Sequence, residues 1–271
     1  MPFTLAHNAA VLPFLRHPLV PIALVAGAMA PDLPYFVMLK PSSVGWLSAL
    51  LSGVQSHQFT HILDVGLPLA LVLAAFLWVV DRPIRWALGT HWFPEQTKPV
   101  GPAPSWAHPV LWTFLSLLIG LLTHLIWDSF THSTGWVVRH VPVLALEPVP
   151  DLPLYRILQH VSTLAGLTVL ILWHRHRRRI AVPTHEPRDC TYQKVRTILL
   201  AFILLGPAAL MAARAMPLAP AVHDYLSAEM FFQVVILRGG AGLLVAALLY
   251  GLAWHTVSAT YTGPGPAVQN H

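Results

Sequence analysis

The sequence predicts an all-α fold, a polytopic bundle of membrane-spanning helices. Of its 271 residues, 55% are hydrophobic and only 10% are charged, and the mean hydropathy is +0.61. A soluble domain carries about 25% charged residues, so this composition is typical of helices surrounded by lipid. The apolar residues also lie in long runs separated by polar or proline-rich segments, which favours several separate spans.

Six apolar stretches predict about six transmembrane helices, for each of which about 20 residues are needed. A further apolar piece, residues 3–15, is too short to cross and predicts a short N-terminal re-entrant or interfacial helix. Proline-rich linkers at 93–104 and 263–266 separate or follow the helices. In chain order, the predicted spans are residues 19–39, 62–80, 109–131, 157–173, 196–216 and 234–254.

The distribution of basic residues predicts the orientation of the spans. Seven of the 16 Lys and Arg residues lie between Arg175 and Arg196, and such a cluster beside a span is typical of a cytoplasmic loop. This position argues against a nucleic-acid partner, although the formal net charge is +5. Counting outward from the cluster places residues 81–108 inside as well, and residues 40–61, 132–156 and 217–233 outside.

We expect the chemistry to reside in the first four spans. The last two spans contain no acidic residue, and no histidine occurs in them before His255. The single cysteine excludes an internal disulfide bond. The expected division is a membrane domain carrying a metal site at 1–175, a basic cytoplasmic loop at 176–195, two further transmembrane helices at 196–256 and a flexible tail at 257–271.

Ionisable residues inside an apolar stretch identify the candidate site. His124 and Asp128 are four residues apart, so a helix places them on one face, with His132 one turn further on. A carboxylate in hydrocarbon is costly and needs a partner. Imidazole and carboxylate groups are together the usual ligands of zinc and other first-row metals. Asp128 is therefore the first candidate for a metal ligand.

Other spans bring similar residues to the same predicted depth. Asp32 follows Pro31, which interrupts helical hydrogen bonding and lets the backbone turn towards a cavity. His57 and His61 have the i, i+4 spacing that holds one metal ion from a single helix face. His160 begins the fourth span at this level. Because four spans deliver histidine or carboxylate to their outer ends, we expect a shared site near the outer face of the membrane.

Four blocks of the sequence also match a known pattern, in the same order along the chain. They are MPFTLAH at 1–7, AMAPDLPYF at 28–36, HLIWDSFTH at 124–132 and PLYRILQH at 153–160. Together they cover about residues 1–175 and resemble a bacterial membrane family catalogued as domain of unknown function 4184. The resemblance implies an integral protein of the bacterial cytoplasmic membrane. It further implies a distant similarity to YdjM-type membrane-bound metal-dependent hydrolases and to zinc-dependent phospholipases C.

The resemblance also implies a set of metal ligands. Around His57 the related pattern has a Thr-His pair followed by Ser, whereas this chain has Ser56-His57-Gln58 and then Thr60-His61, so either histidine is a candidate for the homologous ligand. His7 belongs to the set only if the N-terminal segment folds back to the depth of the site. The implied ligands are His7, Asp32, His57, His124 and Asp128, with His61, His132 and His160 as additions.

These observations lead us to expect a membrane-embedded metal-dependent hydrolase that acts on a phosphoester of a lipid or amphiphilic molecule. One to three divalent ions, with zinc first and iron as the alternative, would activate water and stabilise charge on the phosphoryl oxygens. His132 and His160, where they are not ligands, would protonate the leaving group. Two alternatives stay open: a metal-dependent oxygenase, cyclase or isomerase acting on an apolar substrate, and an ion or metal transporter. The sequence leaves the oligomeric state open.

Overall fold

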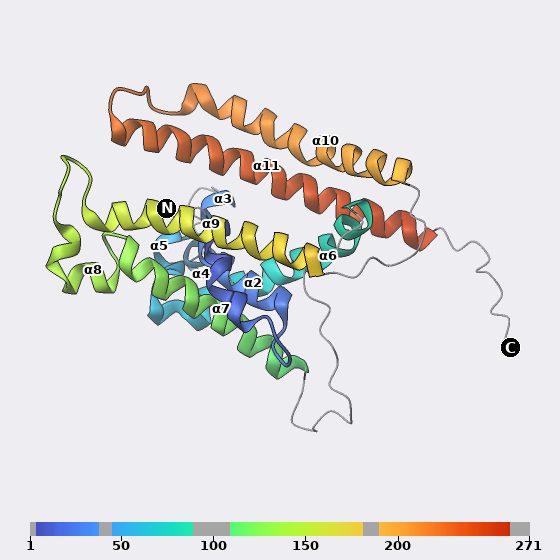
Figure 1. Ribbon diagram of the computed structural model, residues 1–271, viewed down its shortest axis with the longest axis horizontal. Helices are drawn as coiled ribbons and strands as arrows, with labels where there is room; N and C mark the ends of the chain where they lie inside the picture. The colour runs from blue at the N-terminus through green and yellow to red at the C-terminus, as the bar shows by residue number, and fades with distance from the viewer. Residues whose placement is uncertain (1–3, 38–44, 89–108, 181–189, 261–271) are drawn as a thin grey trace, which may run out of the picture. The chain divides into compact units, whose positions relative to one another are not determined.

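The computed structural model describes residues 4–37, 45–88, 109–180 and 190–260 (Figure 1). Helical elements dominate these residues, and no β-strand occurs among them. The predicted all-α class is therefore confirmed. The chain divides into two compact units, one made of residues 1–75 and 93–186 and the other of residues 76–92 and 187–271.

Five helices in the described part of the chain are long and apolar enough to cross a membrane. They account for the second to sixth predicted spans. The first predicted span, 19–39, is instead a shorter apolar segment, Pro21–Val37, and it is interrupted. The five long spans are Phe59–Leu88, Pro109–His140, Leu154–Arg177, Thr191–Leu218 and Tyr225–Thr260. This architecture is that of a helical membrane protein.

The first unit is built mostly from short helical elements that pack around two long helices. In chain order it contains η1 (Thr4–His7), α1 (Asn8–Val11), η2 (Leu12–Phe14), α2 (Pro21–Met29), η3 (Ala30–Asp32), α3 (Leu33–Val37), α4 (Gly45–Leu50), α5 (Gly53–Ser56), η4 (Phe59–His61), the π-helical turn η5 (Ile62–Gly66), the first part of α6 (Leu67–Leu88), α7 (Pro109–Thr131), α8 (Trp136–His140), η6 (Pro142–Ala145) and α9 (Leu154–Ile180).

Helices α2 and α7 cross at two glycines. A Cβ atom on Gly27 would overlap the carbonyl of Leu117, and one on Gly120 would overlap the carbonyl of Leu24. Small residues allow membrane helices to approach this closely. The crossing therefore fixes the end of α2, and the 3-10 turn η3 that follows it, against one face of α7.

The N-terminal segment folds into the unit instead of lying on its surface. Ala6, His7 and Val11 are almost completely buried, and Val11 packs with Leu24 and Ala28 in a small apolar core. On the other side, Gly166 of α9 gives the backbone of η1 room, because a Cβ atom there would lie 2.9 Å from the carbonyl oxygen of Ala6. The predicted short N-terminal helix is thus present, and its burial favours the re-entrant alternative.

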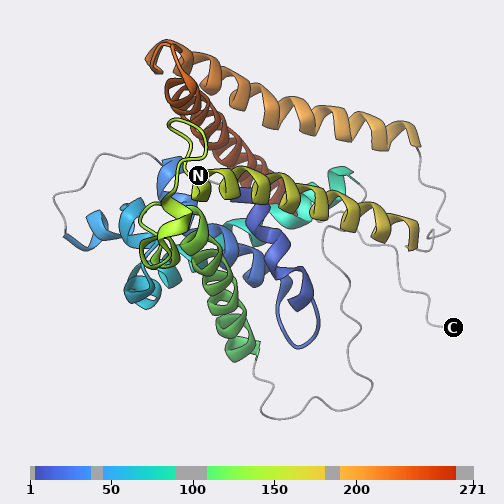
Figure 2. The same cartoon turned by 60° about the vertical axis from the view of Figure 1, so that its left-hand side comes forward.

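The second unit contains the end of α6, α10 (Cys190–Ala215), η7 (Met216–Leu218) and α11 (Tyr225–Thr260). Helices α10 and α11 run side by side in opposite directions (Figures 1 and 2). Gln193 donates a hydrogen bond of 2.6 Å to the carbonyl of Ala87, and the guanidinium group of Arg196 lies 4.2 Å from the ring centre of Trp86. The end of α6 therefore belongs with these helices, a grouping absent from the sequence-based division.

The proline-rich linkers at 93–104 and 263–266 lie outside the described residues, as do residues 181–189 of the predicted basic loop at 176–195 and most of the predicted tail at 257–271.

Candidate metal centre

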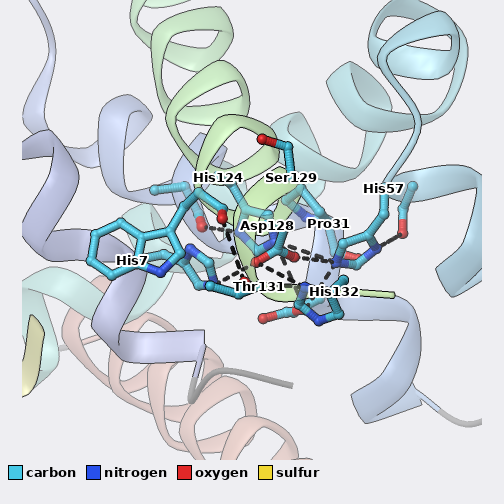
Figure 3. Close-up of polar contacts among 12 residues, drawn as sticks. His7, Pro31, His57, His124, Asp128, Ser129, Thr131 and His132 are labelled. Carbon is cyan, nitrogen blue, oxygen red and sulfur yellow. Dashed lines mark hydrogen bonds and ion pairs between the residues drawn. The ribbon is translucent and has the colours of Figure 1, made fainter. Parts of the chain in front are cut away.

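Five ionisable side chains from separate segments meet inside the first unit (Figure 3). His7 comes from η1, Asp32 from η3 and His57 from the residue after α5, whereas His124 and Asp128 lie one turn apart on α7. His7, Asp32 and His124 are at most 1% exposed, and Asp128 is 5% exposed. The structure thus brings together the five residues that the family resemblance implied.

Asp128 lies at the centre of this cluster. Its Oδ2 atom is 3.2 Å from Nε2 of His124 and 3.3 Å from Nε2 of His57. Its Oδ1 atom is 3.5 Å from Nε2 of His7 and 3.5 Å from Nδ1 of His132. One carboxylate therefore faces four imidazole rings.

Asp32, in the 3-10 turn η3, faces the imidazoles of His57 and His124. Its Oδ1 atom is 3.3 Å from Nε2 of His57 and 3.9 Å from Nε2 of His124. Pro31 lies in the 3-10 turn that ends α2, and its carbonyl accepts a hydrogen bond of 2.7 Å from the hydroxyl of buried Ser56. This bond ties the turn that carries Asp32 to the residue next to His57.

Backbone carbonyls orient two of the imidazole rings. Nδ1 of His57 lies 2.7 Å from the carbonyl of Gly53, and Nδ1 of His124 lies 2.7 Å from the carbonyl of Ala28. A carbonyl oxygen only accepts hydrogen bonds, so both Nδ1 atoms carry a proton and both Nε2 atoms face the carboxylates. Histidines that bind metals are commonly oriented in this way.

Several buried atoms of the cluster lack a hydrogen-bond partner in the described part of the chain. They are Oδ2 of Asp32, both carboxylate oxygens of Asp128 and both ring nitrogens of His7. Leaving a buried polar atom unsatisfied costs about 1–3 kcal/mol, and more when the group is charged. Two buried carboxylates with open coordination sites therefore favour a cation between them.

His7 and His57, the two cluster histidines that lie outside the spans, have pKa values shifted in opposite directions by this environment. Burial lowers the pKa of the His7 imidazole to about 3, so this ring is neutral and able to donate an electron pair. Burial also opposes the charged form of His57, but its contacts with the carboxylates of Asp128 and Asp32 raise its pKa to about 10. The carboxylates thus draw positive charge to this point, and a metal cation would supply it in place of a proton.

The spacing of the donor atoms fits a first-row metal ion. In a tetrahedral zinc site with bonds of about 2.0–2.1 Å, neighbouring ligand atoms lie about 3.3–3.4 Å apart. Nε2 of His57 is 3.3 Å from Nε2 of His124, and the contacts from these two atoms to Asp32 and Asp128 range from 3.2 to 3.9 Å. Two overlapping groups of three donors therefore suit a metal cation, one made of His7, Asp32 and His124 and the other of His57, His124 and Asp128.

The remaining sequence candidates lie elsewhere or at the edge. Nδ1 of His61 is 2.8 Å from Oδ2 of Asp64, and both residues are solvent-accessible, so of the His57 and His61 pair the structure brings only His57 into the cluster. The His132 side chain lies at the rim and is 26% exposed. His160 is exposed on α9 and belongs to neither group of donor atoms found among the described residues.

Two supporting residues were not among the site residues predicted from the sequence. Ser56 joins η3 to His57, and its only sequence signal is that it precedes a candidate ligand. The ring of Trp127 lies edge-on 5.6 Å from the ring of His7, and its indole nitrogen donates a hydrogen bond of 3.2 Å to Ser162 of α9. Trp127 thereby connects the N-terminal segment, α7 and α9 beside the cluster.

The fold and the cluster together define a helical membrane protein with a buried histidine and carboxylate centre suited to a metal cation. The chain belongs to the family described as Domain of unknown function (DUF4184), whose model matches residues 1–252. The match therefore extends beyond the four sequence blocks and includes α10 and most of α11. No curated protein and no solved structure matches the chain. The similarity to YdjM-type hydrolases stays a prediction.

Proposed function

We propose that this protein is a membrane-embedded metal-dependent hydrolase that cleaves a phosphoester of a lipid or other amphiphilic molecule. The proposal is carried by the pair of buried carboxylates, Asp32 and Asp128, which face imidazole nitrogens at the spacing of metal ligands and keep oxygens without a hydrogen-bond partner among the described residues. A purely structural cluster would instead satisfy these oxygens with hydrogen-bond donors.

The donor set favours zinc, with iron as the alternative. Nitrogen and carboxylate donors without a thiolate suit both metals. When bound, a divalent cation would supply Lewis-acid chemistry that acidifies water and stabilises charge on a phosphoryl oxygen. In this proposal Asp32, His57, His124 and Asp128 are ligands of one or more ions, and the carbonyls of Gly53 and Ala28 keep the Nε2 atoms of His57 and His124 directed at the metal.

The position of the cluster along the spans supports an amphiphilic substrate. Asp128 lies near the end of α7, and His57 lies just before the span that begins at Phe59. We therefore place the site near one face of the cytoplasmic membrane, the outer one by the distribution of basic residues. At that depth a lipid presents its phosphate, whereas the acyl chains lie deeper. The partly exposed His132 ring marks the side from which the cluster is reached.

The direct test is hydrolysis by the detergent-purified protein after metal analysis. We expect a zinc-dependent release of product from a phosphodiester, and loss of this activity in Asp128→Asn and His124→Ala. His61→Ala is the matched control, because His61 pairs with Asp64 away from the cluster. Turnover that persists after complete metal removal would contradict the proposal. Iron together with oxygen consumption would instead assign the oxygenase alternative.

A further inference from the structure

The segment between α7 and α9 carries a row of exposed apolar side chains next to the metal centre. Trp136 is 57% exposed, Val143 is 50% exposed and Leu146 is 61% exposed. Val141 and Val149 are exposed as well. In Figure 1 this segment, which contains α8, joins the end of α7 to the start of α9. We refer to residues 136–149 as the α8 loop.

The α8 loop is an ordered surface. Val138 is buried and anchors the loop, while backbone hydrogen bonds of 2.9 Å join Val141 to Val137 and Leu154 to Leu146. The ring of Trp136 stacks on His140, with ring centres 4.3 Å apart. Its apolar side chains are therefore held outward by a folded backbone, and their exposure is not that of a loose tail.

The two spans that adjoin the loop also expose apolar side chains. On α7, Ile126 and Phe130 are exposed, and on α9 the exposed residues include Val161 and Leu164. Exposed apolar residues on a spanning helix face lipid. A short connecting segment that exposes apolar side chains between two such helices is expected to contact the bilayer as well.

Trp136 and Arg139 of the loop suit the headgroup level. Tryptophan is enriched at the membrane interface, where its ring is in apolar surroundings and its nitrogen reaches water. Arg139 is exposed beside the buried Val138, and a long basic side chain at this depth extends to the phosphates. The backbone nitrogen of Gly135, which precedes α8, donates a hydrogen bond of 2.8 Å to the carbonyl of His132 at the rim of the cluster.

We infer that the α8 loop lies within the headgroup layer of the bilayer, and that it brings lipid to the rim of the metal centre from the side. The sequence analysis assigned this segment only to an outer loop, residues 132–156. Its role in substrate entry rests on the proposed function, whereas its depth in the membrane does not.

Nitroxide labels on single cysteines measure this depth without any substrate. Cys190, the only cysteine of the chain, is first replaced in the full-length protein by Cys190→Ser. Val143→Cys and Leu146→Cys are then labelled in phosphatidylethanolamine and phosphatidylglycerol nanodiscs, and collisions with oxygen and with a water-soluble nickel chelate are compared. Phe202→Cys is the lipid control, because Phe202 is 73% exposed on α10. Asp224→Cys is the aqueous control, because Asp224 is exposed just before α11.

We expect both loop labels to collide with oxygen severalfold more, relative to nickel, than the Asp224→Cys label does. Values equal to those of the aqueous control would overturn the inference. The depth measurement is independent of the hydrolysis assay described above. Loop labels in lipid together with a protein that is inactive in that assay would therefore contradict the hydrolase proposal alone. Loop labels in water together with an active enzyme would contradict this inference alone.

Discussion

Nε2 of His124 lies 3.2 Å from Oδ2 of Asp128, one turn further along the same helix, and both side chains are buried. The proton on Nδ1 of His124 is committed to the carbonyl of Ala28, so Nε2 is the ring nitrogen left to bind a cation. This pair links the crossing of α2 and α7 to the chemistry of the cluster.

Removal of the metal should lower the thermal stability of the protein. A ligand at 100 times its dissociation constant stabilises the folded state by about 2.7 kcal/mol. We expect a chelator to lower the apparent Tm in detergent and zinc to restore it. In Asp128→Asn the Tm should no longer respond to zinc, whereas His61→Ala should respond like the wild type. A wild-type Tm that changes with neither chelator nor zinc would argue against a bound ion.

His57 and His61 should differ sharply in their contribution to zinc binding. His57 faces both carboxylates, whereas His61 is paired with Asp64 at the surface. We expect His57→Ala to lose most of its bound zinc and His61→Ala to keep it, as measured by elemental analysis of the purified proteins. Equal zinc contents in these two variants would show that the cluster is not the binding site.

Ser56 should affect metal affinity without being a ligand. Its hydroxyl bonds to the carbonyl of Pro31 and holds the Asp32 turn beside His57. Removing an outer partner of this kind typically weakens metal binding about 10–100-fold. We expect a loss in this range for Ser56→Ala in a competition titration with a zinc chelator. Ser227→Ala, which removes a hydrogen-bonding hydroxyl near the start of α11, should leave the affinity unchanged.

The glycine crossing should be intolerant of any side chain. A Cβ atom on Gly120 would overlap the backbone of α2, and overpacking of this kind costs about 1–3 kcal/mol. We expect Gly120→Ala to lower the Tm and the zinc content together, because the crossing places Asp32 against α7. Gly206→Ala is the matched control, since among the described residues no atom outside its own turn of helix lies within 4 Å of a Cβ there. It should be neutral or stabilising by up to about 1 kcal/mol.

The sequence predicted the long helices well and the interrupted ones poorly. The predicted span 109–131 coincides with α7, because a long apolar run without internal proline allows only one regular structure. The span 19–39 is broken because Pro31 and Pro34 cannot continue the hydrogen bonding of α2. Helix α9 runs beyond residue 173 to Ile180, since basic residues extend a helix although they end an apolar run.

The site was predictable where it depends on regular spacing. His124 and Asp128 share a helix face because α7 is regular there. His57 and His61 do not share a helix face, because α5 ends at Ser56 and a separate 3-10 turn begins at Phe59. The position of His7 depends on where the N-terminal segment packs, which is a long-range property that local sequence does not carry.

The metal content of the purified protein tests the central claim most directly. Wild-type protein, prepared without added chelator, should contain at least about one zinc or iron ion per chain. Asp128→Asn, prepared in parallel and folded by circular dichroism, should contain little or none. A folded wild-type protein that neither contains nor takes up such an ion, or a variant that binds as much as the wild type, would contradict the account.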